Sequence, residues 1–401
     1  MTHNTTRQGL VAETQLTIDQ AKNLTNTLLK QGRLRDAQAL IQQLQLAQPM
    51  DAEVDLLAAE CEFYGGHPNI ARSLVLKASH TSPDLDKVKA ALAEIEALDR
   101  TLASNDYRNS FLILRNRHMD YPMNIQLETV GRCNAKCDFC PHSKLERKFA
   151  VMGDELFEKI VNEASVIPPS SQLNFYMNVV NEPFMDKKIF SRMRMLNDKI
   201  DHATIGIYTN MNIMPPHFFE RLAEIRQITY WNVSFNAANK KEYEESMGIN
   251  FERTVTNIRS FLSENRKNNY VRDPVYLSRI ATGSEADSRF IEECKSLFAG
   301  YNCNEEFVPV CKNRADWLGQ VQVTRQSTIP VLLPCNQWFN ISILCNGIVP
   351  HCCMDAKGAF PLGDVNKQSI LEIYNSPHFR NLRENAISRD VIYPCNTCAL
   401  L

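Results

Sequence analysis

The chain has 401 residues, of which 44% are apolar and 22% are charged, so it is long enough for two or three domains with sizeable cores. Its formal net charge of −2 offers no basic excess for nucleic acid and no acidic tail. No apolar run approaches the ~20 residues that cross a bilayer, and the N-terminal residues lack the apolar core of a signal peptide. We therefore expect a cytoplasmic protein that binds neither nucleic acid nor membrane.

Residues 17–105, after a flexible N-terminus at 1–16, show helical periodicity and few β-branched residues. Several positions recur 34 residues later, namely Gly32 as Gly66, Ala37 as Ala71, Leu40 as Leu74, Ile41 as Val75 and Pro49 as Pro83. This period resembles that of tetratricopeptide repeats, with Gly at the turn, Ala at the helix contact and Pro closing the second helix. Residues 84–102 would form a closing helix. A helical bundle with a chance period is the alternative.

Residues 118–318 alternate between strand and helix patterns. We predict strands at 124–130, 172–180, 203–208, 228–235, 275–281 and 304–310, separated by helices at 155–164, 188–198, 216–225, 251–263 and 288–298. Strands that alternate with helices form parallel sheets, so the pattern indicates an α/β fold, a partial (β/α)6 TIM-like barrel. Ligands of such sheets bind at the carboxyl ends of the strands.

Residues 330–401 are rich in cysteine and have little regular pattern. Residues 341–345 and 348–350 are predicted to form a hairpin around Asn346-Gly347, which is a strong turn signal. Helices are predicted at 369–375 and 378–387. This segment would be a small C-terminal Fe-S domain beside the N-terminal all-α repeat domain and the barrel.

Thirteen cysteines in a chain without an export signal indicate metal binding more than disulfides. Cys133, Cys137 and Cys140 have the spacing C-x3-C-x2-C on the loop after the first predicted strand. Three thiolates there can hold three corners of a 4Fe-4S cluster and leave one iron open to a small molecule. Zinc is the alternative, but His142, its nearest fourth ligand, follows Cys140 too closely to complete a tetrahedron easily.

The cysteine loop resembles the motif of the radical S-adenosylmethionine superfamily, and the similarity extends through the rest of the chain. The resemblance implies that S-adenosylmethionine (SAM) binds the open iron. One electron from the cluster would then release methionine and a 5′-deoxyadenosyl radical, which takes a hydrogen atom from a substrate carbon. The cofactors carry this chemistry, while the protein orients the reactants and excludes water. An external electron donor of the flavodoxin or ferredoxin type is also implied.

The same resemblance assigns SAM-binding roles to residues at the strand ends. Phe139 corresponds to the aromatic residue beside the adenine, and Glu182 corresponds to the residue that receives the methionine ammonium. Asn181 stands where the family has a Gly, and Thr209 and Asn210 belong to a Thr-Asn-Gly-like turn that has Met211 in place of Gly. Ser234 and Asn236 correspond to a Ser-x-Asp-like strand end. Arg279 would pair with the methionine carboxylate or form an ordinary salt bridge.

A second set of cysteines, Cys335, Cys352, Cys395 and Cys398, ends the sequence. Four convergent thiolates complete a cluster that has no open iron. The segments at 347–355, 362–365 and 371–376 resemble the SPASM/Twitch group of the superfamily, with Gly347 at a tight turn. The sequence ends at residue 401, before the further cysteines of the full SPASM pattern, so we expect one auxiliary 4Fe-4S cluster. The alternatives are a structural zinc, or Cys353 or Cys345 in place of Cys352.

The auxiliary cluster would accept an electron after hydrogen abstraction, which suits net oxidation or crosslinking, or would help to bind substrate. Epimerisation needs a hydrogen donor instead. The candidate donors are the spare cysteines Cys303, Cys311, Cys345 and Cys353. Alternatively, each of them is a small apolar residue of the protein core.

Three functions compete. The first is a radical SAM enzyme that oxidises, crosslinks or epimerises a peptide or protein, since helical repeats offer concave surfaces to chain segments. The second is a radical SAM dehydrogenase or epimerase of a sugar or aminocyclitol in natural-product or polysaccharide biosynthesis, with the repeats binding a partner enzyme or a second copy. The third is a non-catalytic Fe-S electron carrier or adaptor. Glu182, Thr209 and Ser234 count against the third, because a carrier needs no SAM pocket.

Overall fold

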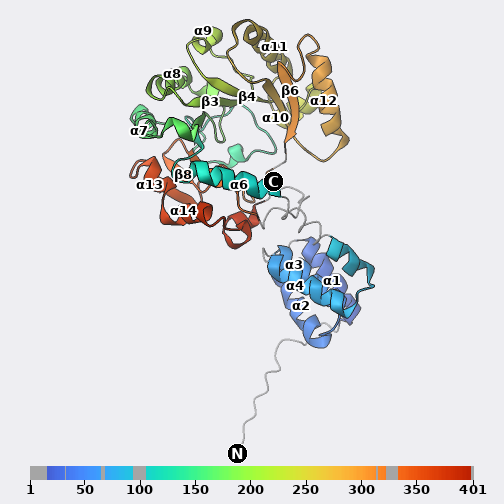
Figure 1. Ribbon diagram of the computed structural model, residues 1–401. Coiled ribbons are helices and arrows are strands. Elements are labelled where there is room, and N and C mark those ends of the chain that lie inside the picture. Colours follow the sequence, from blue (N-terminus) through green and yellow to red (C-terminus); the bar gives the residue numbers. More distant parts are fainter. Residues whose placement is uncertain are drawn as a thin grey trace, which may run out of the picture. The chain divides into compact units, whose positions relative to one another are not determined.

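The computed structural model describes residues 16–31, 33–64, 68–93, 105–312, 315–321 and 333–398. The chain divides into two compact units, Met1–Asn105 and Asp106–Leu401 (Figure 1). Most of the expected flexible N-terminus, both repeat glycines at 32 and 66, and the last part of the expected closing helix lie outside the described residues.

In the described part of the first unit, each helix packs on the next one along the chain. The helices are α1 (Ile18–Lys30), α2 (Leu34–Ala47), α3 (Ala52–Tyr64) and α4 (Pro68–Thr81), followed by a helical segment at 86–93. A capping box begins α1, because Thr17 accepts a hydrogen bond from the backbone of Gln20 and the Gln20 side chain accepts one in return.

Positions 34 residues apart have equivalent surroundings in this unit. Ala37 and Ile41 on α2 are buried, as are Ala71 and Val75 on α4. Both helices end just before a proline, at Ala47 and Thr81. This equivalence agrees with a repeated helical hairpin, while the likeness to tetratricopeptide repeats stays a prediction.

The second unit contains a seven-stranded sheet in the order β6-β5-β4-β3-β2-β1-β7, in which every neighbouring pair is parallel. Six of its strands match the expected ones. They are β1 (Asn124–Leu127), β2 (Asn174–Tyr176), β3 (Thr204–Thr209), β4 (Ile228–Ser234), β5 (Val275–Ile280) and β6 (Phe307–Lys312). The α/β partial barrel is therefore confirmed.

The seventh strand, β7 (Asn340–Ile343), comes from the cysteine-rich segment and pairs with β1, so that Asn340 lies opposite Asn124. The predicted hairpin is therefore wrong in its pairing. A turn does occur at Gly347, whose φ of 88° favours glycine. However, β8 (Ile348–Pro350) leaves that turn to pair antiparallel with β9 (Pro361–Asp364). The turn signal was local, whereas the partners of the two strands depended on distant residues.

Helices cover the outer side of the arc of strands (Figure 1). They are α7 (Asp154–Ala164), α8 (Ile189–Lys199), α9 (Phe218–Leu222), α11 (Phe251–Asn268) and α12 (Glu285–Leu297). The remaining helices of this unit are α6 (Asn105–His118), which sequence patterns missed, α10 (Lys240–Met247), α13 (Ile370–Tyr374) and α14 (Pro377–Glu384), with 3₁₀ turns at Pro141–Lys144, Pro169–Ser171, Pro183–Met185, Asn336–Phe339, Arg389–Val391 and Cys395–Thr397.

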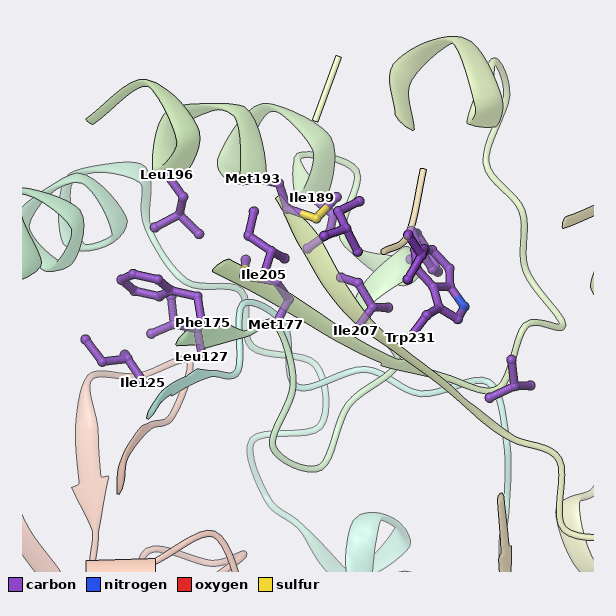
Figure 2. Close-up of a cluster of buried hydrophobic side chains, with 14 of the residues drawn as sticks. Ile125, Leu127, Phe175, Met177, Ile189, Met193, Leu196, Ile205, Ile207 and Trp231 are labelled. Carbon is purple, nitrogen blue, oxygen red and sulfur yellow. The ribbon is translucent and has the colours of Figure 1, made fainter. Parts of the chain in front are cut away.

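The two faces of the sheet differ in chemistry. The face toward the helices is apolar, and Figure 2 shows Phe175, Ile205 and Ile207 of the strands against Met193 and Leu196 of α8. Burial of each such side chain contributes about 1.5–3 kcal/mol, so this layer holds the strands in place.

The opposite face is polar, as the period-two alternation of strands requires. Asn124 donates to Asn340 at 2.7 Å and accepts from Asn174 at 3.0 Å, which links β7, β1 and β2. Nearer the carboxyl ends, tyrosines from four adjacent strands lie in contact. This face therefore offers hydrogen-bonding groups and aromatic rings.

Candidate active site

The loop that follows β1 brings three thiols together. Lys136 N in this loop donates to Met247 O at 2.8 Å, which fixes the loop against α10. Burial, and then the neighbouring thiols of Cys140 and Cys133, raise the pKa of Cys137, so the three sulfur atoms are close enough to interact. Burial also raises the pKa of Cys133 to about 12 and that of Cys140 to about 11.

Half-buried thiols with raised pKa values ionise more readily with a positive charge nearby, and iron supplies one. The surroundings agree with a cluster site. Cys137 Sγ lies 3.3 Å from Met247 Sδ, Cys133 Sγ lies 4.0 Å from Asn210 Nδ2, and Cys140 packs against an apolar group that includes Val179. The three half-buried thiols and their neighbours therefore fit a 4Fe-4S cluster.

The zinc alternative depended on His142. Its Nε2 lies 2.8 Å from the carbonyl oxygen of Gly131, which can only accept a hydrogen bond, so this nitrogen serves as a donor. Within the described residues, no three His, Cys, Asp or Glu side chains lie close enough together to hold a single metal ion. This arrangement counts against one zinc ion but not against a 4Fe-4S cluster, whose thiolates bind separate irons.

Glu182 is a buried carboxylate beside the cysteine loop. Its backbone N donates to the carbonyl of Arg132 at 2.8 Å, next to Cys133. Its Oε1 accepts from Thr209 Oγ1 at 2.8 Å, and its Oε2 accepts from Asn210 N at 2.7 Å. No lysine or arginine in the described part of the chain forms an ion pair with it. Burial raises the pKa of Glu182 to about 7, so a bound ammonium ion would stabilise its charged form.

The turn after β3 holds Glu182 in place. Thr209, the last residue of β3, also accepts a hydrogen bond from Met211 N at 3.0 Å. Met211 has a φ of 54°, in the left-handed region that glycine adopts without strain. The Thr-Asn-Gly-like turn is therefore formed although methionine replaces its glycine.

The remaining residues of the expected SAM pocket follow β2, β4 and β5. Asn181 Oδ1 accepts from Val179 N at 3.0 Å, and its buried Nδ2 has no hydrogen-bond partner in the described residues. Ser234 ends β4 half-buried. Asn236 has a φ of 62°, donates to Met247 Sδ at 3.1 Å and accepts from Ile280 N at 2.9 Å.

Two expected residues have partners elsewhere in the protein. Arg279 donates to Asn236 O and pairs with Glu242 at 2.7 Å and Asp287 at 2.8 Å, so its charge is balanced, and a role toward a methionine carboxylate stays a prediction. Phe139 is half-buried, and its carbonyl accepts from Trp317 Nε1 at 3.2 Å.

The C-terminal cysteines form a second group that includes Cys353. Burial raises the pKa of Cys352 far above its usual value, and Cys353, Cys335 and Cys398 add to the shift. Burial, and then Cys335 and Cys398, also raise the pKa of Cys395 to about 12. Five thiols therefore influence one another here, and the choice of Cys352 or Cys353 as the ligand stays a prediction.

Cys345 lies beside Glu128. Burial and the neighbouring Glu128 raise its pKa to about 12, and its backbone N donates to Glu128 Oε2 at 3.3 Å. In the C-terminal group, His351 Nε2 lies 3.1 Å from Cys395 Sγ, and burial followed by His378 lowers the pKa of His351 to about 4. A neutral imidazole therefore stands beside the thiol.

Two family models match the parts of the chain that carry these two thiol groups. Residues 127–276 match the radical SAM superfamily, and residues 335–399 match SPASM, an iron-sulfur cluster-binding domain. The chain contains a radical SAM domain and a SPASM domain. The two domains imply SAM and two 4Fe-4S clusters as cofactors.

Several known proteins are similar to parts of this chain. It is 26% identical to the tungsten-containing aldehyde ferredoxin oxidoreductase cofactor-modifying protein of Pyrococcus furiosus, over 25% of this chain and 27% of that relative. The match thus spans about a quarter of the relative's length. Among solved structures, Streptococcus suis SuiB bound to precursor peptide SuiA is 13% identical with a TM-score of 0.50, covering 81% of this chain and 83% of that one.

A second solved structure, native anSMEcpe with bound AdoMet, is 13% identical with a TM-score of 0.50, covering 67% of this chain and 84% of that one. At this identity the two structures establish the fold alone. In the described part of this chain, no helix is long and apolar enough to cross a membrane.

The structure separates the spare cysteines of the radical SAM domain. Cys303 precedes β6 and therefore lies toward its amino end, away from the strand ends that are expected to bind SAM. Cys311 contacts the Asp287 carbonyl of α12 at 3.6 Å, on the helix-covered face of the sheet. Neither is brought to the three-cysteine loop, and their role as hydrogen donors stays a prediction.

Sequence patterns missed Lys312, the last residue of β6. Its Nζ donates to Asn232 Oδ1 at 2.7 Å and lies 4.7 Å from the centroid of the Tyr208 ring. Lys312 could have been found in the sequence as a charged residue at the end of a mostly apolar strand. The same pattern pointed to Glu182.

Proposed function

We propose that Cys133, Cys137 and Cys140 hold the SAM-binding cluster, and that the enzyme takes a hydrogen atom from a carbon of a peptide or protein. The observation that supports this assignment best is the position of Glu182. Its backbone is bonded to residue 132 of the cysteine loop, and its carboxylate is buried without a cationic partner among the described residues. A SAM molecule on the open iron would bring an ammonium group to such a carboxylate.

The bound cofactors would supply the reaction itself, in which one-electron cleavage of SAM gives methionine and a 5′-deoxyadenosyl radical, hydrogen transfer gives 5′-deoxyadenosine and a substrate radical, and the auxiliary cluster can accept an electron. Thr209 and the Asn210 amide would orient Glu182 for the ammonium. Met247, beside Cys137, and the apolar group around Cys140 would exclude water.

An auxiliary cluster held by the second group of thiols would favour net oxidation or crosslinking over epimerisation. Cys353 is near enough to Tyr208 to add to the raised pKa of that tyrosine, after burial, Tyr230 and Tyr176. This supports an auxiliary site near the polar face of the sheet, where a substrate radical would form. An electron acceptor in this position favours loss of an electron and a proton from the substrate.

A peptide or protein substrate is supported by the helical hairpins of the first unit, since stacked hairpins offer surfaces to chain segments. SuiB, which shares the fold, has been solved with its precursor peptide. A flavodoxin-like or ferredoxin-like donor would supply the electron for SAM cleavage.

The assignment is tested by reconstituting the protein anaerobically and adding dithionite and SAM. We expect 5′-deoxyadenosine from the wild type. Changing Cys133, Cys137 and Cys140 together to Ala should abolish the product and remove one cluster's iron, while the matched variant Cys61→Ala, in the first unit, should keep full iron content. Unchanged iron in the triple variant would contradict the ligand assignment, and a loaded wild type that forms no product would support the electron carrier.

Deletion of residues 1–105 tests the substrate class. If the substrate is a peptide held by the helices, the deletion should lower turnover of that peptide and leave formation of 5′-deoxyadenosine without substrate intact. Full activity of the shortened chain on a sugar or aminocyclitol would favour the alternative substrate.

A further inference from the structure

Lys312 carries a positive charge onto the polar face of the sheet. Its Nζ donates to Asn232 Oδ1 at 2.7 Å and to the Tyr230 hydroxyl at 3.3 Å. It also lies 4.7 Å from the ring centroid of Tyr208 and 5.9 Å from that of Tyr230. Two of the three ammonium hydrogens are thus engaged by neutral oxygens, and the aromatic rings favour the cationic form.

No carboxylate neutralises this ammonium within the described part of the chain. The other charged side chains of the neighbouring strands are already paired, as Arg279 on β5 is with Glu242 and Asp287. The titratable groups that face Lys312 are the hydroxyls of Tyr208 and Tyr230, both neutral because burial raises the pKa of each. A half-buried cation without an anion is energetically unfavourable. Charged groups in such unfavourable positions occur most often at functional sites.

Aromatic rings from neighbouring strands line the surface beside Lys312. The ring centroids are 5.8 Å apart for Tyr176 and Tyr208, 5.3 Å for Tyr208 and Tyr230, and 5.0 Å for Tyr230 and Tyr276. The rings therefore form a continuous row from β2 to β5. Such a row gives a substrate flat apolar contacts with hydroxyls among them.

Tyr208 of this row lies near residues of both candidate cofactor sites. Tyr208 is followed by Thr209, which binds Glu182 of the SAM pocket. On the other side, the thiol of Cys353 is close enough to Tyr208 to affect its pKa. We therefore expect a substrate held against the row to approach both the hydrogen-abstracting and the electron-accepting groups.

We propose that Lys312, Asn232 and the tyrosine row form a subsite that binds an oxyanion of the substrate, with Lys312 supplying the charge. This inference rests on the proposed radical SAM function and adds a chemical requirement, namely that the substrate bears a carboxylate or a phosphate. A peptide would present a carboxylate, whereas a nucleotide-linked sugar would present a phosphate.

The subsite is tested on the reconstituted holoenzyme by trace labelling with acetic anhydride, followed by mass spectrometry of each lysine. Three samples at equal ionic strength contain potassium chloride, N-acetylglutamate or inorganic phosphate. We expect one or both oxyanions to reduce labelling of Lys312 by about tenfold, as a charge-assisted contact predicts, while labelling of exposed Lys240 stays constant. Protection by N-acetylglutamate alone identifies a carboxylate, and protection by phosphate alone identifies a phosphoryl group.

Calorimetric titration of the protective oxyanion gives a second readout. Lys312→Met should weaken its binding about tenfold to a hundredfold, Lys312→Arg should keep it within a few-fold, and the matched surface variant Lys240→Met should match the wild type. Equal labelling of Lys312 in all three samples, or equal binding by Lys312→Met and the wild type, would overturn the proposal. The labelling result needs no variant, so it holds even where Lys312→Met fails to fold.

Formation of 5′-deoxyadenosine is measured on the same wild-type preparation. If this product forms and neither oxyanion protects Lys312, the radical SAM function stands and the oxyanion subsite is wrong. If no product forms from a loaded enzyme, the proposed function fails whatever the labelling shows.

Discussion

Arg147 donates two hydrogen bonds to the buried carboxylate of Glu128, from Nε at 2.6 Å and from Nη2 at 3.0 Å. Glu128 directly follows β1, and its backbone N donates to Ile343 O at the end of β7. Its carboxylate also accepts from Cys345 N at 3.3 Å. One carboxylate thus joins the strand before the cysteine loop, the segment after that loop and the SPASM domain.

Removal of Arg147 should therefore be strongly destabilising. In Arg147→Met the Glu128 carboxylate remains buried without its partner, which costs about 3–5 kcal/mol. The double variant with Glu128→Gln should regain part of this loss, because no charge is left buried. Urea unfolding followed by tryptophan fluorescence measures the larger unit, since all three tryptophans lie there. A loss below about 1 kcal/mol, the range of exposed pairs, would contradict this role.

Glu182→Gln should weaken SAM binding. The substitution keeps the size and removes the charge that would face the ammonium. A charge-assisted hydrogen bond contributes about 1.5–3 kcal/mol, so the SAM concentration for half-maximal 5′-deoxyadenosine formation should rise about tenfold to a hundredfold. The control Glu158→Gln changes an exposed carboxylate of α7 and should leave the half-maximal SAM concentration unchanged. An unchanged SAM dependence in Glu182→Gln would mean that the ammonium binds elsewhere.

Gly206→Ala should disturb the tyrosine row. A Cβ on Gly206 would lie 2.2 Å from Cε1 of Tyr176, so the ring must move. Overpacking of this kind costs about 1–3 kcal/mol, and it should also weaken oxyanion protection of Lys312. The control is Gly153→Ala, where a Cβ meets no atom within 4 Å and stability should change little. Equal unfolding curves for the two variants would show that the ring has room to shift.

Local patterns were enough to predict the strands of the barrel, because apolar runs of strand length alternate with amphipathic helices. They also predicted the turns at Met211 and Gly347, since these depend on neighbouring residues. They failed for β7, whose pairing with β1 joins residues more than two hundred positions apart, such as Asn124 and Asn340. A hairpin signal at Asn346-Gly347 therefore suggested the wrong partner.

The candidate site shows the same division. Cys133, Cys137, Cys140 and Glu182 could be proposed from the sequence because short motifs carry them, and the structure brings Glu182 to the cysteine loop. Lys312 and the tyrosines were missed because they come from five strands, and only the sheet register brings them to one face. Likewise, the presence of both Cys352 and Cys353 beside Cys335 follows from the fold of the SPASM domain and not from their spacing.

The pH dependence of stability should reveal the environment of Lys312. Burial lowers its pKa from 10.5 to about 8 in the folded protein. Between these values the unfolded chain binds the proton more strongly, so the contribution of Lys312 to stability is present above the higher value and is lost as the pH falls toward 8. Lys312→Met removes this dependence. Relative to the wild type, the free energy of unfolding of Lys312→Met should therefore be larger, meaning a more stable variant, at pH 8 than at pH 10, as measured by urea unfolding. Tyr208 and Tyr230 are common to both proteins and largely cancel, so a difference that does not vary with pH would show that Lys312 titrates as a solvated lysine.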